Sequence, residues 1–437
     1  MVRKYSGLFL LVLLITSTLL AQTYEDALKP FQYLNPTAGY SFIFGDHALL
    51  AKDVTALFSN PANLGLAGKT SLLVSFQNNR MYQYSTPSVG GKEKSGKSEY
   101  KNFGGIGFLY NVPVYRGTLA LGIAYMPVAV YDNLFVAQGL YKITSSTDTV
   151  FNKYNLQETG LLNSLSIGFS VEFRKNLFVG CSINFYNGYR IHDFEREEVD
   201  TLDFFEHHYY MDSENIEPEY RGRNITLGLT YVYTPFLYGF RLSTPIRLKT
   251  EETSQIEYKT VYDTGDEESD TWEYNLNYEI TYPVEFSTAL GFKTSAFELA
   301  LNATFHNWNM IKFNSDIIDV GEDGDTLSID PEINSNIHSL LKQTLDVSFG
   351  AVYHIGRKIE LMFGYRIIQK PYRDLGKDYS SINEISTGIK YSIGELSLFI
   401  AYKFVSTKEL IYQETFGTLT DQRLQRHRIN ITTSLAL

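Results

Sequence analysis

Apolar residues alternate with small or polar residues in short segments from Lys69 to the end of the chain. The alternation is clearest over residues 161–173, where one side carries Leu165, Ile167, Phe169, Val171 and Phe173, and the other carries Ser164, Ser166, Gly168, Ser170 and Glu172. A period of two predicts β-strands with one apolar face. About fourteen such segments follow one another, which is typical of a β-barrel that spans a membrane.

The links between these segments are by turns very short and very long. Short links fall at 174–176, Thr234-Pro235, Gly356-Arg357 and Gly394-Glu395, whereas polar stretches cover 79–100, 191–219, 249–277 and 307–343. Short turns at one rim and long loops at the other are expected of an outer-membrane barrel. An even number of strands then places both ends of the barrel at the periplasmic rim.

A soluble β-sandwich also alternates, because its apolar faces turn to a core. Two features favour a barrel. The second face of many segments is small and neutral, as a lumen requires, and the chain begins with an export signal. We therefore predict an all-β protein, a transmembrane antiparallel β-barrel formed by residues 69–437.

The export signal occupies residues 1–21. Arg3 and Lys4 precede an apolar run from Leu8 to Leu20, and cleavage is expected after Ala21. No other stretch approaches the roughly 18 apolar residues that a transmembrane helix needs. Membrane embedding must therefore come from strands.

Residues 22–68 break the alternation. Pro61 disfavours helix at Asn60 and ends a possible short helical turn. The Gly, Ala and Phe content of the segment favours packing inside a barrel over a free periplasmic tail. We predict a plug, or hatch, in the lumen.

Composition narrows the function classes. Aromatic residues make up 15% of the chain, with 33 Tyr and 29 Phe, which suits aromatic girdles at two membrane interfaces. The formal charge of −11 offers no basic field for nucleic acid. Cys181 is the one cysteine, so an intramolecular disulfide is excluded.

Several motifs resemble those of one family. Residues 53–64 contain Asn60-Pro61-Ala62, residues 122–127 end in Pro127, and 239–246 include Pro245. Tyr282-Pro283, Trp308, Gly364-Tyr365-Arg366 and Pro371 follow in order. Together they resemble the FadL-type outer-membrane transporters of long-chain fatty acids, which include toluene and xylene channels. The likeness covers the whole mature chain and agrees with the predicted strand number.

That resemblance implies a gated route for hydrophobic molecules. A hatch would fill the lumen, outer loops would capture ligand, and the ligand would leave sideways through the wall near the third strand. The residues that match the hatch and gate are Asn60, Pro61, Ala62 and Pro127. Pro127 has no N–H to donate to a ladder, which weakens strand pairing; a plain strand end at the membrane rim is the alternative.

Apolar capture in an outer loop is expected just after the third strand, at Leu134, Phe135, Val136, Leu140 and Tyr141. The other predicted loops are acidic, for instance Asp266 to Asp270. An acidic mouth disfavours the carboxylate of a fatty acid. Neutral hydrocarbons or lipids therefore stay open as substrates.

Strand alternation turns several basic residues inward: Arg241, Arg247, Arg366, Lys390 and Lys403. A cation in the lumen is a candidate site for a carboxylate ligand. The alternative is an ion pair with one of the inward acids Glu172, Glu285, Glu298 or Glu384.

Other polar motifs carry little chemistry. Asp319 to Asp325 lacks the spacing of a calcium loop, and Glu206-His207-His208 lacks further spaced ligands. Asp263-Thr264-Gly265 occurs once, within an acidic stretch. We find no nucleophile with a base and no phosphate loop, and we expect no enzyme, metal or cofactor.

The sequence thus predicts a monomeric channel in the outer membrane of a diderm bacterium for passive uptake of hydrophobic molecules, fatty acids or hydrocarbons. Its expected partners are membrane lipid, lipopolysaccharide and a small hydrophobic ligand, without nucleic acid. The alternative is an interaction barrel that holds a protein partner, similar to the shuttle component of type IX secretion. A receptor or structural barrel without transport is a third possibility.

Overall fold

The computed structural model describes residues 27–31, 34, 36–87, 92–142, 149–201, 206–316, 318–320, 326–373, 376–413 and 418–437. The predicted signal peptide and the start of the predicted plug, residues 22–26, lie outside these ranges. Among the described residues, no helix is long and apolar enough to cross a membrane.

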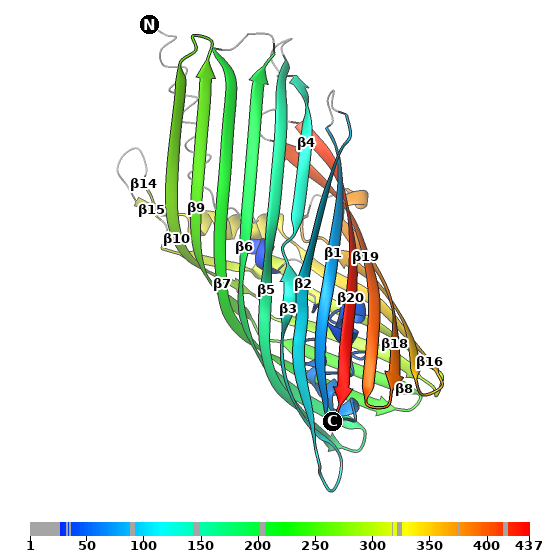
Figure 1. Ribbon diagram of the computed structural model, residues 1–437. Helices are drawn as coiled ribbons and strands as arrows, with labels where there is room; N and C mark the ends of the chain where they lie inside the picture. The colour runs from blue at the N-terminus through cyan, green and yellow to red at the C-terminus, as the bar shows by residue number, and fades with distance from the viewer. Residues whose placement is uncertain are drawn as a thin grey trace.

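One antiparallel sheet closes on itself through pairing of its first and last strands (Figure 1). Its segments are β1 (Ser71–Pro87), β2 (Lys94–Val112), β3 (Leu119–Val130), β4 (Asn133–Lys142), β5 (Thr149–Arg174), β6 (Leu177–Asp200), β7 (His207–Tyr233), β8 (Phe236–Ser243), β9 (Ile246–Tyr262), β10 (Glu267–Tyr282), β11 (Glu285–Lys293), β12 (Phe297–Asn307), β13 (Lys312–Ser315), β16 (Gln343–Ile355), β17 (Ile359–Gln369), β18 (Ser381–Ile393), β19 (Leu396–Gln413) and β20 (Thr418–Ala436).

Four of the barrel strands are each interrupted once. β3 and β4 both pair with β5, and β8 and β9 both pair with β7. β10 with β11, and β12 with β13, likewise form single interrupted strands. Eighteen segments less four interruptions make a closed barrel of 14 strands, which confirms the predicted fold.

Helices and a small hairpin complete the described chain. The N-terminal part contains η1 (Lys29–Phe31), α3 (Gly39–Phe44), α4 (Ala56–Ser59) and η2 (Pro61–Leu66). η3 (Trp308–Met310), β14 (Ile318–Val320), β15 (Thr326–Ser328), α5 (Asp330–Leu340) and η4 (Lys377–Tyr379) connect later strands.

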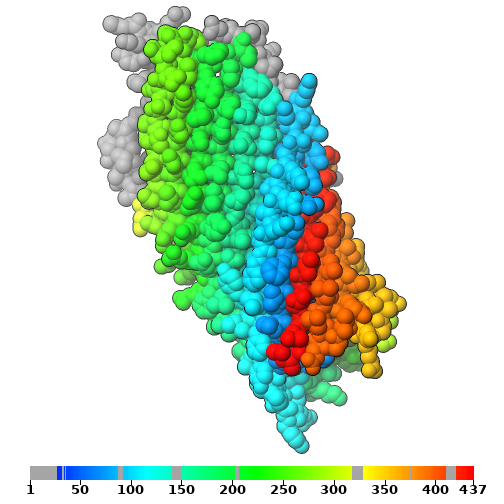
Figure 2. All heavy atoms as spheres, in the orientation of Figure 1, coloured from blue at the N-terminus to red at the C-terminus, as the bar shows by residue number. Residues whose placement is uncertain are grey.

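The outer face of the barrel carries a belt of exposed apolar side chains over its lower half. Leu72 and Phe76 on β1, and Ile429 and Ile431 on β20, belong to this belt. An apolar band of this kind is the surface that a membrane barrel turns to lipid. Above the belt the strands continue, and β5, β6, β7, β9 and β10 form a tall wall (Figures 1 and 2).

The tall wall corrects the prediction of long loops at 191–219 and 249–277. Both stretches are mostly strand, within β6, β7, β9 and β10, and β1 and β2 likewise cover most of 79–100. Their outward side chains are polar because the wall there lies beyond the apolar belt. A strand exposed to water on its outer face lacks the apolar alternation of a strand in lipid.

Three neighbouring strands reverse their inward parity at their interruptions. Ser243 faces inward before Thr244-Pro245, and Ile246 faces inward after it. Tyr282 and Glu285 both face inward across Pro283, and Trp308 and Ile311 do so across η3. Apolar residues therefore face outward on the part of each strand below the interruption and face inward on the part above it.

This reversal makes one position a sensitive probe. In a Cys181→Ser background, we expect Arg247→Cys to react rapidly with a maleimide in detergent micelles and Leu248→Cys to remain protected, because Arg247 is exposed and Leu248 is buried. Labelling is read by mass shift. Reaction at 248 with protection at 247 would mean that the alternation runs through Pro245 without a break.

Candidate functional site

The described residues between 27 and 68, here the N-terminal segment, lie inside the lower half of the barrel (Figure 1). The helices α3, α4 and η2 are almost entirely buried. Small wall residues make this approach possible. A side chain at Gly180 would lie 2.4 Å from the Ala62 nitrogen, and one at Gly228 would lie 2.0 Å from Asn60 Oδ1.

Asn60 fastens the middle of the segment. Its Nδ2 donates to the Ala48 carbonyl at 2.7 Å and to Thr230 Oγ1 on β7 at 3.0 Å, and its Oδ1 accepts from the Ala62 N–H at 3.1 Å. The last contact caps η2, whose first residue is Pro61. Asn60 thus satisfies backbone groups that would otherwise be buried without a partner.

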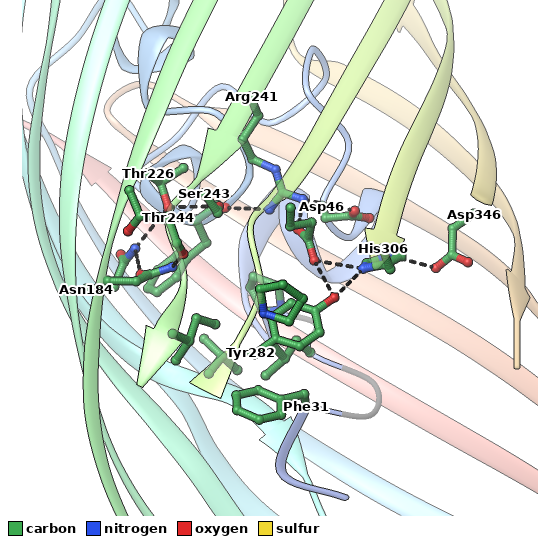
Figure 3. A pocket seen from close by; sticks show the side chains of 18 of the residues that line it. Phe31, Asp46, Asn184, Thr226, Arg241, Ser243, Thr244, Tyr282, His306 and Asp346 are labelled. Atoms are coloured by element: carbon green, nitrogen blue, oxygen red, sulfur yellow. Dashed lines mark hydrogen bonds and ion pairs between the residues drawn. The ribbon is translucent and has the colours of Figure 1, made fainter. Parts of the chain in front are cut away.

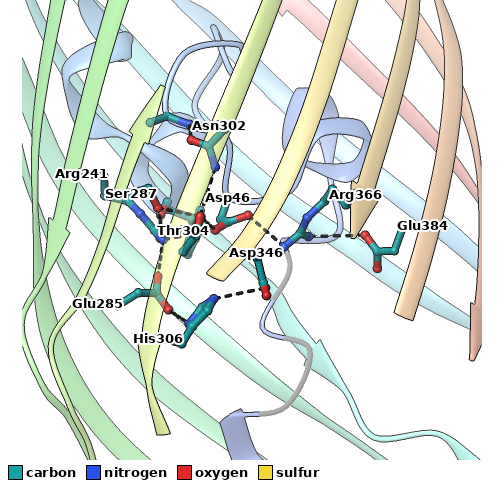
Figure 4. Close-up of polar contacts among 12 residues, drawn as sticks. Asp46, Arg241, Glu285, Ser287, Asn302, Thr304, His306, Asp346, Arg366 and Glu384 are labelled. Atoms are coloured by element: carbon teal, nitrogen blue, oxygen red, sulfur yellow. Dashed lines mark hydrogen bonds and ion pairs between the residues drawn. The ribbon is translucent and has the colours of Figure 1, made fainter. Parts of the chain in front are cut away.

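Asp46 fixes the segment to two strands of the wall (Figure 4). Its Oδ1 lies 3.0 Å from Arg366 Nη2, and its Oδ2 lies 3.4 Å from Arg241 Nη2. Thr304 donates a hydrogen bond of 2.6 Å to Oδ2. Burial alone would raise the pKa of Asp46, but the two guanidinium groups hold this pKa well below its usual range.

The same two arginines also contact acids of the barrel wall. Arg241 pairs with Glu285, and Arg366 Nη1 lies 3.4 Å from Glu384. His306 lies between Glu285 at 2.9 Å and Asp346 at 3.3 Å. The result is a buried network in which each cation has at least one acidic partner.

A cavity of about 100 Å³ lies beside this network (Figure 3). Its apolar side is formed by Phe31, Val128, Ile246, Tyr282 and Trp308. The Phe31 and Tyr282 rings stack with centroids 4.9 Å apart, and Tyr282 and Trp308 lie 5.1 Å apart. The cavity thus offers aromatic rings on one side and a network of paired acids and bases on the other.

The wall next to the cavity is incomplete between β2 and the β3–β4 strand. β2 pairs with β3 only from Ile106 to Val112. Within the described part of the chain, β1 is the only strand that pairs with residues 94–105. At Pro127 the ladder between β3 and β5 shifts register, which leaves Val128 as an extra residue. Val128 is one of the residues that line the cavity.

The N-terminal segment spans this gap. The Thr37 hydroxyl lies 2.9 Å from the Gly104 carbonyl on β2 and 3.0 Å from the Pro127 carbonyl on β3. The Thr37 carbonyl in turn accepts from Asn430 on β20 at 2.7 Å. Its neighbour Pro36 lines the cavity. A residue of the N-terminal segment therefore bridges β2 and β3 just beyond their last paired residues, Ile106 and Tyr125.

Beyond Pro127 the chain turns inward. Gln422 of β20 donates to the Leu134 carbonyl at 2.9 Å, and Gln83 and Ser85 of β1 donate to the Val136 carbonyl. Side chains thus satisfy the edge of β4 that lacks a strand partner. Within the described part of the chain, β4 therefore forms no ladder with β2.

Four of the five predicted lumen cations face inward. Arg241, Arg366 and Lys403 are buried, and Lys390 is partly buried, with its Nζ 3.0 Å from the Tyr40 hydroxyl. The prediction for Arg247 is wrong, because the interruption at Thr244-Pro245 turns it outward.

Ion pairing, the alternative role for these cations, is what the geometry shows. Lys403 lies 3.7 Å from Glu384, and Glu298 pairs with Lys293 and with Lys52 of the N-terminal segment. Glu172 instead accepts a hydrogen bond from Asn176 at the short turn.

The predicted capture residues do not form an outer loop. Leu134, Phe135 and Val136 belong to β4, where Leu134 packs with Met81 and Leu424, and Phe135 packs with Tyr154. Leu140 and Tyr141 lie on the same strand, and their side chains fall outside the described part.

Sequence reasoning missed Thr37, Asp46 and His306. Thr37 and Asp46 sit in a segment without a period, so no pattern marks which wall strands they meet. His306 follows the alternation of β12 and faces inward with Asn302 and Thr304. Its even-numbered position on this strand was the one feature of the sequence that could have placed it in the lumen.

No model of a known protein family matches the chain, and no curated protein matches it in sequence. Solved structures do resemble it. The Pseudomonas putida toluene transporter TodX aligns over 93% of this chain and 99% of its own, with a TM-score of 0.60 and 12% identity.

Two further channels give similar values. A Pseudomonas aeruginosa FadL homologue covers 92% of this chain and 98% of its own, with a TM-score of 0.56 and 13% identity. The Ralstonia pickettii toluene transporter TbuX covers 93% and 100%, with a TM-score of 0.56 and 12% identity. The predicted resemblance to FadL-type channels is confirmed as a shared fold.

Removal of the Asp46 charge should loosen the N-terminal segment. We expect Asp46→Asn to lower the free energy of unfolding by about 2–3 kcal/mol, because two buried arginines lose one of their acidic partners. Urea unfolding followed by tryptophan fluorescence measures this. Glu257→Gln, an exposed change of the same charge on β9, should leave the midpoint unchanged.

The pH dependence of the Asp46 effect follows from the direction of its pKa shift. Since the folded-state pKa lies below the unfolded value of about 3.9, the stabilisation is present above that pH and declines below it. The difference between wild type and Asp46→Asn should be constant from about pH 5 upward and shrink under acid conditions. A difference that grows on acidification would contradict the ion-pair assignment.

Proposed function

We propose that this protein is an outer-membrane channel for passive uptake of small hydrophobic molecules, with the N-terminal segment as its gate. The apolar belt supports a membrane location, and the fold is that of channels whose solved examples include toluene transporters. Barrels of this type belong to the outer membrane of diderm bacteria. The proposal includes monomeric function, without catalysis.

One observation carries the proposal: Pro36 lines the cavity, and its neighbour Thr37 bridges carbonyls of β2 and β3 where the paired stretch of these two strands ends. Backbone groups in lipid need partners. At this gap the carbonyls of Gly104 and Pro127 share the one hydroxyl proton of Thr37, a residue of a separate segment. Withdrawal of that residue would connect the cavity to the gap between β2 and β3.

A sideways route suits a hydrophobic ligand. Transfer from a cavity into lipid keeps apolar area from water, at roughly 25 cal/mol per Å². A cavity of about 100 Å³ does not hold an extended acyl chain, so long ligands require displacement of Pro36, Thr37 or the aromatic rings. Lateral exit next to Pro127 is therefore our proposed path.

The polar network favours a neutral ligand over a fatty acid. Both arginines that line the cavity, Arg241 and Arg366, already contact carboxylates. A ligand carboxylate would have to displace an internal acid. An aromatic hydrocarbon would contact Phe31, Tyr282 and Trp308 without that cost.

The tall wall supports a second candidate, an interaction barrel. β6 and β7 rise far above the apolar belt and would offer a large surface to a protein partner. Transport and partner binding are separable in a reconstituted system, because flux in pure lipid needs no partner.

Uptake into proteoliposomes tests the proposal. We expect radiolabelled toluene to equilibrate faster than in vesicles mixed with an equal amount of unfolded protein, and faster than labelled oleate at equal free concentration. Flux of neither ligand would remove the channel proposal and favour the interaction barrel. Faster flux of oleate would contradict the neutral ligand class alone.

Thr37 gives a direct test of the gate. Thr37→Val keeps the shape but removes the hydroxyl, which costs the closed state about 1 kcal/mol, so we expect a roughly five-fold rise in toluene flux. Thr37→Ser keeps the hydroxyl and should match wild type. Equal flux in all three proteins would show that these hydrogen bonds do not hold the gate.

A further inference from the structure

Basic residues gather on the outer face where β19, β20, β1 and β2 lie side by side. Strand pairing sets Arg80 of β1 between His427 and Glu99, Tyr82 beside Lys97, and Asn78 beside Lys101. Arg423 lies between Tyr84 and Lys408. We call Arg80, Lys97, Lys101, Lys408 and Arg423 the basic patch.

The basic patch begins where the apolar belt ends. On β1 the exposed Phe76 is followed by Asn78 and Arg80, and on β2 the exposed Phe103 is followed by Lys101. On β20, Ile429 is followed by His427 and then by Gln425 and Arg423. The patch therefore lies at the height of lipid headgroups.

Glu99 is the acid in the middle of the patch, and Asp421, exposed two residues from Arg423 on β20, lies at its upper edge. Glu99 lies 3.0 Å from Arg80 Nε and 3.7 Å from Lys97 Nζ, so two bases share one carboxylate. The patch is thus positive in a chain of net charge −11. Above the belt on β7, β9 and β10, bases alternate with more numerous acids: Arg221, Arg223, Arg247 and Lys249 against Glu217, Glu219, Glu251, Glu273 and Glu279.

Aromatic rings hold the patch in shape. Arg423 lies over the Tyr84 ring at 4.9 Å and Lys97 over Tyr82 at 5.9 Å. The Tyr402 hydroxyl lies 2.7 Å from His427 Nδ1. These tyrosines, with Arg80, Gln425 and His427, line a shallow hollow on the seam between β1 and β20, which is blue against red in Figure 2.

We infer that the basic patch binds the phosphate groups of a phosphorylated glycolipid in the outer leaflet. The inference rests on the proposed outer-membrane location. Each Lys or Arg side chain near an anionic lipid surface is attracted to the negative charge of the headgroups. Arg can also pair with a phosphate through two parallel hydrogen bonds.

The spread of the basic patch favours a large headgroup. Strands lie about 4.8 Å apart, so four strands from β19 to β2 span about 14 Å. That width fits a headgroup with more than one phosphate, such as that of diphosphoryl lipid A. Ile429 and Phe76 below would contact its acyl chains.

Lipid binding to the full-length protein in detergent micelles tests this, with diphosphoryl lipid A as the probe and native mass spectrometry as the readout. We expect the triple variant Arg80→Gln/Lys97→Gln/Arg423→Gln to lose about two orders of magnitude in affinity. The matched control Arg221→Gln/Arg223→Gln/Lys249→Gln removes the same charge from exposed positions on β7 and β9 and should bind as wild type does.

Two further arms sharpen the result. Dephosphorylated lipid A and phosphatidylglycerol should both bind at least ten-fold more weakly than diphosphoryl lipid A. Equal binding of either lipid, or of the triple variant, would overturn the inference. Toluene flux of the triple variant in phosphatidylcholine vesicles should equal that of wild type, so a failure here is distinct from a failure of the proposed channel.

Discussion

A barrel in lipid depends on one constraint: every backbone N–H and C=O of its wall needs a hydrogen-bond partner, because the hydrocarbon offers none. This chain meets the constraint by closing β1 on β20 and by pairing neighbours around the ring. The exception lies between β2 and the β3–β4 strand. There the Thr37 hydroxyl contacts carbonyls of β2 and β3. The side chains of Gln83, Ser85 and Gln422 donate hydrogen bonds to carbonyls of β4. The placement of the N-terminal segment and the cavity follows from that exception.

The three interruptions at Thr244-Pro245, Pro283 and η3 obey a second constraint, the change of solvent at the membrane surface. Below them the wall turns apolar residues such as Phe240 and Phe286 outward; above them it turns Leu248, Ile280 and Phe313 inward. Even-numbered positions of β10 and β11 are mostly apolar from Trp272 to Phe292, and the break at Pro283 decides which side they face. The lining of the cavity by Ile246, Tyr282 and Trp308 results from this reversal.

The alternation of apolar residues therefore predicted those features that depend only on an unbroken strand. It gave the barrel, the strand number and the inward direction of Arg241, Arg366 and Lys403. It failed at Arg247, because one extra residue at a proline reverses parity without a change in the pattern of apolar residues. It also mistook the tall wall for loops, since strands with polar outer faces resemble loops in sequence. The contacts of Thr37 and Asp46 join residues hundreds of positions apart, such as Asp46 and Arg366, and no local pattern encodes them.

The proposed route requires the cavity to open towards lipid at the gap beside Pro127. A spin label at Val128→Cys in bilayers, in a Cys181→Ser background, tests this through its collisions with two relaxation agents. We expect toluene to raise collisions of the label with lipid-dissolved oxygen and to leave its collisions with a water-soluble nickel complex unchanged. A rise with the nickel complex alone, or no change with either agent, would contradict a lateral opening.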